Sequence, residues 1–358
     1  MKNTKNSANR RVLGQLLHGS WRDFIACIAA SLLFTAFELV IPQIIRVSVD
    51  SLIGSGPVKV AAARPVVQAL GGVDYLRQNL WIPAAMMAGF GLLSALMRYC
   101  VNLYSAKAGE TLVKTSRDLL YHHIQHLPWK WHMENPTGDI IQRCTSDVEV
   151  VRNFIAEQMV ELLSTTFLIA VYMIAMFAMN VKISLFVFAF IPVIVGYSLV
   201  FYKRISKGYQ KADEAEGELS STVQENITGV RVVRAFGRER DELEKFQRKN
   251  NNYANIWMKL GDMMTVFWSL GDVMSMAQVF GVIAIGVQLC VKGEITLGTY
   301  LAFVSYTRQL TWPVRALGRT LSEMSKAGVS IDRLLYILGA EPEKGPEAPA
   351  VWRGRFPG

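Results

Sequence analysis

The stretch "ENITGVRVVRAFGRERDELEKF", residues 225–246, decides the fold because it separates two long apolar runs. Each run is long enough to cross a hydrocarbon core of roughly 30 Å, which needs about 20 helical residues. The stretch itself is rich in charge, and Gly229 in its first third would permit a turn. A passive anchor would need only a short polar turn here. We therefore expect this segment to have a task outside the membrane.

Composition indicates a helical membrane protein with several spans. The chain has 358 residues, of which 51% are hydrophobic and 19% are charged, whereas soluble domains carry about 25% charged residues. The net charge of +9 could mark a nucleic-acid-binding face, but we favour the positive-inside bias of membrane proteins. The expected outer loops hold only five of the 38 lysines and arginines, namely Lys59, Arg64, Arg77, Lys182 and Lys292.

Six apolar segments predict six membrane-spanning helices in an all-α fold. We place this membrane domain at residues 24–327, with spans at about 24–53, 80–103, 159–179, 183–202, 263–291 and 297–317. Residues 1–23 read as a cytosolic tail followed by an interfacial helix, because "RRVLGQLLHGSW" alternates basic and apolar residues. Residues 328–358 read as the end of the sixth helix and a linker rich in proline and glycine.

The connections after spans two and four are much longer than the others. Helical periodicity continues through both of them, which predicts helices of about 40 residues, roughly 60 Å long. Such helices are about twice as long as the hydrocarbon core is thick. Each pair therefore projects far beyond the membrane, with a short element at its tip. The outer turns after spans three and five are minimal.

Both tips carry apolar residues that a partner would cover. The first, "LPWKWHMENPTGD", places Trp129 and Trp131 between Pro128 and Pro136. Exposed tryptophans are costly unless covered, and tryptophan is a preferred anchor at interfaces. The second tip has an apolar run at Val230, Val232, Val233, Ala235 and Phe236. The alternative is that each tip packs against its own helices.

Three stretches resemble one family, the transmembrane domain of an ATP-binding-cassette exporter half-transporter. "HLPWKWHMENPTGDIIQRCTSDVEVVRNF" resembles its first intracellular loop, with a T-G-D…R…D-V pattern. "VQENITGVRVVRAFGRERDELEKF" resembles its second loop. "YLAFVSYTRQLTWPVRALGRTLSEMSKAGVSIDRLLYIL" resembles its sixth helix, with a proline at mid-helix. The similarity covers roughly residues 20 to 340.

The resemblance implies that the tips are coupling helices, at about Pro128–Asn135 and Glu225–Val233, which dock on nucleotide-binding domains. ATP-driven closure of those domains would switch the membrane cavity from inward- to outward-facing. Two half-transporters, identical or different, would form a domain-swapped dimer in which the second coupling helix reaches the partner's nucleotide-binding domain. The coupling residues would be Pro128, Trp129, Trp131, His132, Met133, Asn135, Glu225, Asn226, Gly229, Val230 and Arg231.

The chain itself is expected to hydrolyse no ATP. The G-x-x-x-x-G-K-[S/T] pattern of a P-loop is absent from the sequence, so we expect ATP and Mg²⁺ to bind to nucleotide-binding domains outside these 358 residues. Either the sequence is a fragment, or those domains belong to a separate polypeptide. We assign no catalytic residue. The expected location is the prokaryotic plasma (inner) membrane, with both termini cytoplasmic, and the cargo stays open.

A few ionisable residues lie inside the predicted spans, where they are costly and usually face a cavity or a partner. Glu38 is predicted to line the transport cavity, with Arg46, Asp272 and Arg308 as weaker candidates. An equally open reading pairs Glu38 with a neighbouring helix. His122 and His126 are one helical turn apart, but without a carboxylate or cysteine at matching spacing we predict no metal site. The alternative function is a non-transporting membrane scaffold or regulator.

Overall fold

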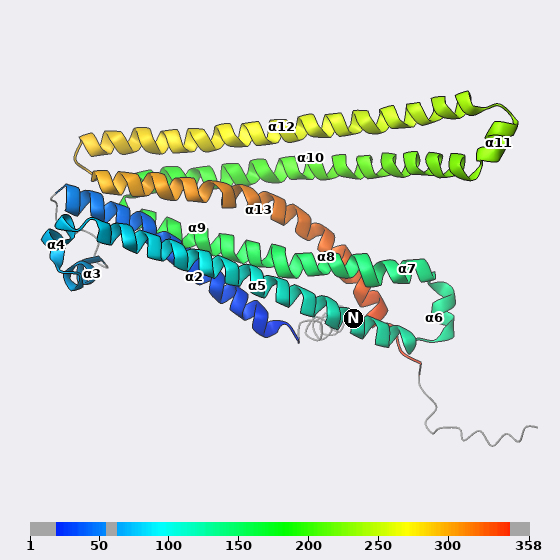
Figure 1. Ribbon diagram of the computed structural model, residues 1–358, viewed down its shortest axis with the longest axis horizontal. Coiled ribbons are helices and arrows are strands. Elements are labelled where there is room, and N and C mark those ends of the chain that lie inside the picture. The colour runs from blue at the N-terminus through cyan, green and yellow to red at the C-terminus, as the bar shows by residue number, and fades with distance from the viewer. Residues whose placement is uncertain (1–18, 55–62, 344–358) are drawn as a thin grey trace, which may run out of the picture. The chain divides into compact units, whose positions relative to one another are not determined.

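The computed structural model describes residues 19–54 and 63–343. All regular structure within those ranges is helical and none of it is strand, which confirms the predicted all-α class (Figure 1). Residues 10–18 of the predicted interfacial helix and residues 344–358 of the predicted linker lie outside the described residues.

The helices follow the predicted order. The first half of the chain contains α2 (Trp21–Val47), η1 (Ser48–Ile53), α3 (Ala63–Ala69), α4 (Gly72–Gln78), α5 (Trp81–Gln125) and α6 (Trp129–Glu134). A continuous helical stretch follows, made of α7 (Thr137–Gln142), η2 (Arg143–Asp147), α8 (Val148–Arg152), η3 (Asn153–Gln158) and α9 (Met159–Met179), where η marks π-helical turns. The last helices are α10 (Val181–Thr228), α11 (Val230–Ala235), α12 (Glu239–Val291) and α13 (Leu297–Leu338).

Five of these helical stretches are long and apolar enough to cross a membrane. They are Trp21–Ile53, Trp81–Gln125, Thr137–Met179, Val181–Thr228 and Glu239–Val291. They overlap the first five predicted spans, whose bounds stay predictions. The helix α13 begins where the sixth span was expected, but Arg308 and Gln309 interrupt its apolar run. Its assignment as the sixth span therefore stays a prediction.

Two minimal turns each join a pair of long helices, α9 to α10 and α12 to α13, as the sequence predicts. Asn180 alone separates α9 from α10, and its side chain caps α10 by accepting hydrogen bonds from the backbone N–H of Lys182 and Ile183. Gly293, with φ of 73°, forms the turn after α12. Lys182 Nζ donates to Glu294 Oε2 at 2.7 Å, so the two turns are linked, and this hydrogen bond lowers the pKa of Glu294.

The described part of the connection between the first two predicted spans, residues 63–79, is largely helical. It contains α3 and α4, whose Val67 and Leu76 are buried against Leu52 of η1. Arg77 of α4 donates from Nε to the carbonyl of Leu52 at 2.9 Å. Valine and leucine side chains of α3 and α4 thus form a small core with Leu52.

The described residues divide into two compact units. The first comprises residues 19–34, 93–164 and 323–343, and the second residues 35–92 and 165–322 without the gap at 55–62. In the first unit, Leu120 of α5, Val148 of α8 and Ile337 of α13 share one core. A further cluster joins Cys27 of α2 to Ala108 of α5.

The core of the second unit contains two fully buried tyrosines. Tyr172 of α9 and Tyr306 of α13 pack with ring centroids 5.2 Å apart. Tyr172 donates its phenolic hydrogen to Gln309 Oε1 at 2.6 Å, and Tyr306 donates to the carbonyl of Leu39 at 2.9 Å. Since each hydroxyl has a partner, burying these rings costs no unpaired polar group. Figure 1 also shows α10 and α12 of this unit running side by side.

A close helix approach in the second unit predicts a sensitive glycine. A Cβ on Gly298 would lie 2.4 Å from the backbone oxygen of Arg46, and the Gly298 N–H donates to Asp50 Oδ1 at 2.7 Å. Gly298→Ala should therefore force α13 away from α2 and lower the free energy of unfolding by about 1–3 kcal/mol. Thermal unfolding in detergent measures this. Gly261→Ala in α12, where a Cβ meets nothing within 4 Å, is the matched control, and equal melting temperatures would contradict the prediction.

Candidate functional site

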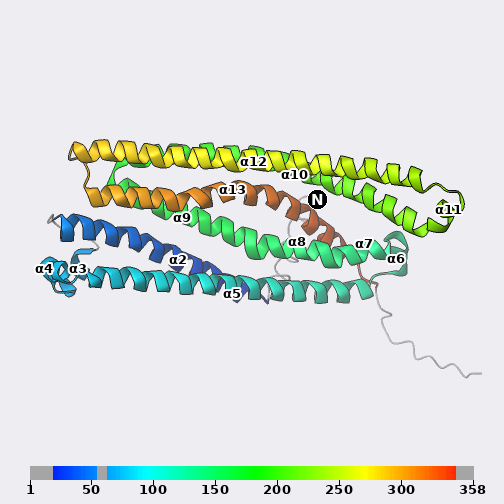
Figure 2. The same cartoon turned by 45° about the horizontal axis from the view of Figure 1, so that its top comes forward.

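The first tip is the short helix α6, which joins α5 to α7 within the first unit (Figure 2). Pro128 precedes it in extended conformation, and Asn135 ends it by donating from Nδ2 to the carbonyl of Trp131 at 2.8 Å. His132 contacts the carbonyl of Ile124 at 3.2 Å. The break at Pro128 and the restart after Pro136 follow the sequence prediction, because proline cannot continue a helix from its interior.

The two tryptophans of α6 have different environments. Trp131 is half-buried and packs against the core that contains Leu127 and Ile337. Trp129, in contrast, is 76% exposed, and Met133 on the next turn is 70% exposed. Trp131 therefore packs within its own unit, whereas the docking of Trp129 on a partner stays a prediction. Asn135 is buried, so its part in this tip is to end α6, and it presents no surface to a partner.

The end of α13 holds the first tip in place. Its Tyr336 lies 6.4 Å from the ring of Trp131 and 5.1 Å from the guanidinium of Arg143. His123 Nε2 lies 3.0 Å from the carbonyl of Ala340, which can only accept, so this nitrogen carries a proton. Ala340, just after α13, is therefore attached to the end of α5 that precedes the first tip.

A buried carboxylate joins η2, which follows the first tip, to α13. Asp147 in η2 is 5% exposed, and its Oδ1 accepts a hydrogen bond from Ser330 Oγ at 2.8 Å. Arg333 Nη1 lies 3.7 Å from the same oxygen. Sequence reasoning did not name these residues as part of the site. A signal was present for Arg143 and Asp147, because both belong to the T-G-D…R…D-V pattern.

The second tip differs from the prediction in its bounds. The short helix α11 runs from Val230 to Ala235, whereas the prediction was Glu225–Val233. Glu225 and Asn226 belong to the last turn of α10, where Asn226 Nδ2 donates to Glu242 Oε2 of α12 at 2.9 Å. These contacts keep the end of α10 helical as far as Thr228.

The glycine that turns the chain at the second tip is also a different one. Gly229 has φ of −92°, a value that any residue adopts. Gly237, between α11 and α12, has φ of +63°, which favours glycine. Gly229 therefore separates α10 from α11, and Gly237 makes the return.

The apolar residues of α11 are largely uncovered. Val232 is 61% exposed, Phe236 is 77% exposed, and Val230 is 46% exposed; Arg231 between them is exposed as well. Contiguous exposed apolar residues mark interaction sites. This tip therefore offers an apolar surface with a cationic side chain, which is the pattern predicted for a docking element.

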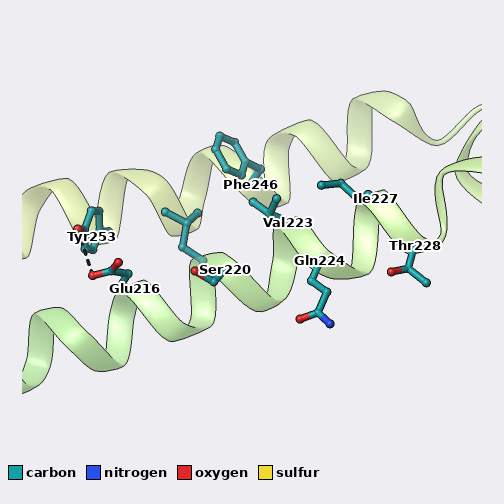
Figure 3. Close-up of a pocket in the computed structure, with 9 residues that line it drawn as sticks. Glu216, Ser220, Val223, Gln224, Ile227, Thr228, Phe246 and Tyr253 are labelled. Carbon is teal, nitrogen blue, oxygen red and sulfur yellow. Dashed lines mark hydrogen bonds between the residues drawn. The ribbon is translucent and has the colours of Figure 1, made fainter. Parts of the chain in front are cut away.

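A groove lies between the two arms that carry α11. Its volume is about 510 Å³. Val223 and Phe246 lie between the ribbons of α10 and α12 (Figure 3). Gln224 and Thr228 point away from α12. Tyr253 donates to Glu216 Oε2 at 3.5 Å across the groove. The groove spaces the arms while contacts at both of its ends keep them parallel.

Ion pairs hold the arms together near the second tip. Lys245 of α12 lies 3.1 Å from Glu225 of α10 and 3.7 Å from Glu242. The hydrogen bond to Glu225, followed by the charge of Glu242, raises the pKa of Lys245. Lys249 and Glu218 form a further pair between the same arms. Because these groups are exposed, each pair contributes little to stability, but together they fix the register of α10 against α12.

The four cavity candidates all lie in the second unit. Glu38 and Arg46 on α2 are half-buried, and Asp272 and Arg308 are exposed. Asp272 Oδ1 pairs with Arg315 Nη1 at 2.9 Å. Arg315 was missed by sequence reasoning; it is 6% exposed and also donates to the carbonyl of Gly271 and to Ser275. The cavity role of the four candidates stays a prediction.

The histidines near the first tip have hydrogen-bond partners of their own. His122 and His126 stack at 4.5 Å, and His126 Nδ1 lies 2.7 Å from the carbonyl of His122. Among the residues that the structure describes, no group of three or more histidine, cysteine, aspartate or glutamate side chains is placed to hold a metal ion.

Fold and tips together define a multi-pass helical membrane protein with two short helices at the turns of long helical arms. The family model of the ABC transporter transmembrane region matches residues 24–314. The chain therefore belongs to the ABC transporter transmembrane region family.

Curated relatives agree with this membership. The uncharacterized ABC transporter ATP-binding protein YknU of Bacillus subtilis is 25% identical over 323 residues, 89% of this chain and 52% of the relative. An ATP-dependent lipid A-core flippase of Desulfotalea psychrophila is 27% identical over 272 residues, 75% of this chain and 47% of the relative. The uncharacterized ABC transporter ATP-binding protein YwjA of Bacillus subtilis is 24% identical over 323 residues, 90% of this chain and 52% of the relative. The chain thus spans about half the length of these relatives.

The environments of Trp129 and Trp131 predict stability effects of different size. Trp131→Ala should leave a cavity beside Leu127 and Ile337 and lower the free energy of unfolding by about 1–3 kcal/mol. Trp129→Ala removes a side chain that is 76% exposed, so the free energy of unfolding should change by less than about 0.5 kcal/mol. Chemical unfolding in detergent, read by hydrogen exchange at α6, measures both. A larger effect for Trp129 than for Trp131 would contradict the packing described.

Proposed function

We propose that this chain is the membrane-spanning permease part of an ATP-driven exporter. The observation that carries the proposal is that both tips are separate short helices with exposed apolar residues. These are Trp129 and Met133 on α6, Val232 on α11, and Phe236 directly after α11. Membership of the family supports it. In this proposal the tips dock on nucleotide-binding domains. Those domains bind ATP and Mg²⁺ and hydrolyse the ATP, and the 358 residues themselves carry no catalytic group.

Transport by alternating access follows from the same proposal. A second half-transporter, identical or different, completes the pore as a domain-swapped dimer, with α11 reaching the partner's nucleotide-binding domain. Rigid arms transmit the closure of those domains, since α10 and α12 are continuous helices of 48 and 53 residues. We place the protein in the plasma (inner) membrane, spanning it six times, with both termini cytoplasmic. The name of the flippase relative favours a lipid-like, amphipathic cargo.

Loss of the exposed side chains at the tips should uncouple the transporter. In the transporter assembled with its nucleotide-binding domains in nanodiscs, Trp129→Ala and Phe236→Ala should each weaken docking about tenfold or more, because aromatic anchors dominate interfaces. The readouts are affinity for the nucleotide-binding domain and ATPase rate. Tyr121→Ala, an exposed aromatic residue on α5 away from α6, is the control. Unchanged affinity in both tip variants would favour a non-transporting scaffold.

Glu38 offers a separate test of the cavity. If its carboxylate faces the cargo, Glu38→Gln should lower transport of cationic cargo several-fold and leave neutral cargo unaffected, since an unscreened charge inside a membrane attracts the opposite charge strongly. Transport into inverted vesicles, with thermal unfolding as a folding control, measures this. Equal transport of every cargo by the folded variant would assign Glu38 to helix packing.

A further inference from the structure

The second tip carries two arginines that no carboxylate of the described chain neutralises. Figures 1 and 2 show α11 at the turn between the arms α10 and α12. Arg231 and Arg234 of α11 are exposed, and within residues 19–54 and 63–343 neither forms an ion pair. Their spacing of three residues places them on one side of the helix. The next arginine differs, since Arg238 Nη1 lies 2.6 Å from Asp241 Oδ2.

Two carboxylates at the ends of the arms have other partners. Glu225 of α10 lies 3.1 Å from Lys245. Glu242 of α12 accepts a hydrogen bond from Asn226 Nδ2 at 2.9 Å and lies 3.7 Å from Lys245. These contacts join one arm to the other, so they leave the positive charge of α11 uncompensated. The tip therefore presents a cationic surface to a partner.

Exposed apolar side chains lie beside these arginines. The Phe236 N–H donates to the carbonyl of Val232 at 3.1 Å, so the helical turn continues to Phe236 and places the two side chains on the same side. Both are more than half exposed. Val230 and Val233 instead line a second groove, of about 370 Å³, together with residues of α10 and α12. One side of α11 thus lies toward its arms, while its arginines and Val232 are left for a partner.

The first tip has a different charge. On α6, Lys130 Nζ lies 3.9 Å from Glu134 Oε1, and both side chains are exposed. The charges of this pair cancel, so the exposed Trp129 and Met133 stand beside no net charge of lysine, arginine or carboxylate on α6. The two tips therefore match surfaces of different electrostatic character.

We propose that the surface of the nucleotide-binding domain that receives α11 is acidic, with carboxylates that pair with Arg231 and Arg234 beside an apolar recess that takes Phe236. This inference rests on the function proposed above and names the chemistry of its second docking surface. A planar guanidinium donates two parallel hydrogen bonds to one carboxylate. Two arginines on one side of a helix therefore fix the direction of approach as well as supplying attraction.

Charge then decides which tip each surface accepts. Opposite charges attract over about one Debye length, roughly 10 Å at 0.1 M salt, and such steering raises the rate of association. The neutral α6 gains no attraction from an acidic surface. Discrimination between two docking surfaces needs only such a difference in affinity, so the arginines of α11 keep the two tips from exchanging places.

The first test measures how fast the nucleotide-binding domain of the assembled transporter associates with the full chain in nanodiscs. Joint replacement Arg231→Gln and Arg234→Gln should slow association about tenfold at low ionic strength and have little effect at 1 M salt, where the Debye length is about 3 Å. The control is Lys207→Gln with Lys211→Gln, which removes the same charge from exposed positions of α10, about 25 Å or more along the helix from α11. Equal slowing by both pairs, or a salt-independent rate for the native chain, would overturn the proposal.

The second test identifies the carboxylates directly. Arg234→Lys keeps the charge and supplies an amine, which a carbodiimide joins to a carboxylate within contact distance. Mass spectrometry should find this lysine linked to an aspartate or glutamate of the nucleotide-binding domain, and Lys211 of the same chain linked to none. If the domain binds but no such link forms, this proposal is wrong and the proposed function stands. If the domain does not bind the native chain at all, both are wrong.

Discussion

The thickness of the hydrocarbon core is the constraint on which the rest of this structure depends. Backbone groups inside a bilayer must be paired within the protein, and a continuous helix achieves this. The helices α5, α10 and α12 have 45, 48 and 53 residues, so at 1.5 Å per residue they are roughly 68–80 Å long. More than half of each helix therefore lies outside a hydrocarbon core of about 30 Å. Short helices at the turns of such arms are placed where only soluble partners reach them.

Each tip combines residues that fix its position with residues that stay exposed. On α6, Trp131 packs toward Tyr336 while Trp129 is uncovered. On the α11 side, Asn226 and Lys245 attach the arms to each other while Val232 and Phe236 are uncovered. A docking element needs both properties, because an unsupported short helix would lose its order and a fully packed one would present no surface.

Much of the fold was predictable because membrane-spanning segments are encoded locally. The starts of α9 at Met159 and of α13 at Leu297 coincide with the predicted ones, since apolar runs and the turn at Asn180 are visible in the sequence. The short helices α3 and α4 were not predicted, because seven-residue helices depend on tertiary packing. The bounds of α11 were misplaced for a related reason. Glu225 and Asn226 belong to α10, where they contact Lys245 and Glu242 of α12 across the turn that contains α11.

By itself, the sequence determined that this is an all-helical membrane protein with two membrane-distant tips, because hydropathy, helical period and proline breaks act over short stretches of chain. The tertiary structure decided which tip residues are exposed, and that Asp147 is buried under Ser330. It also placed Arg315 beside Asp272, and Gln43 beside Tyr306 with one amide oxygen left unpaired. These are pairings between helices separated by tens to hundreds of residues. The sequence does not distinguish two side chains of the same type, because their neighbours are decided only when the helices pack.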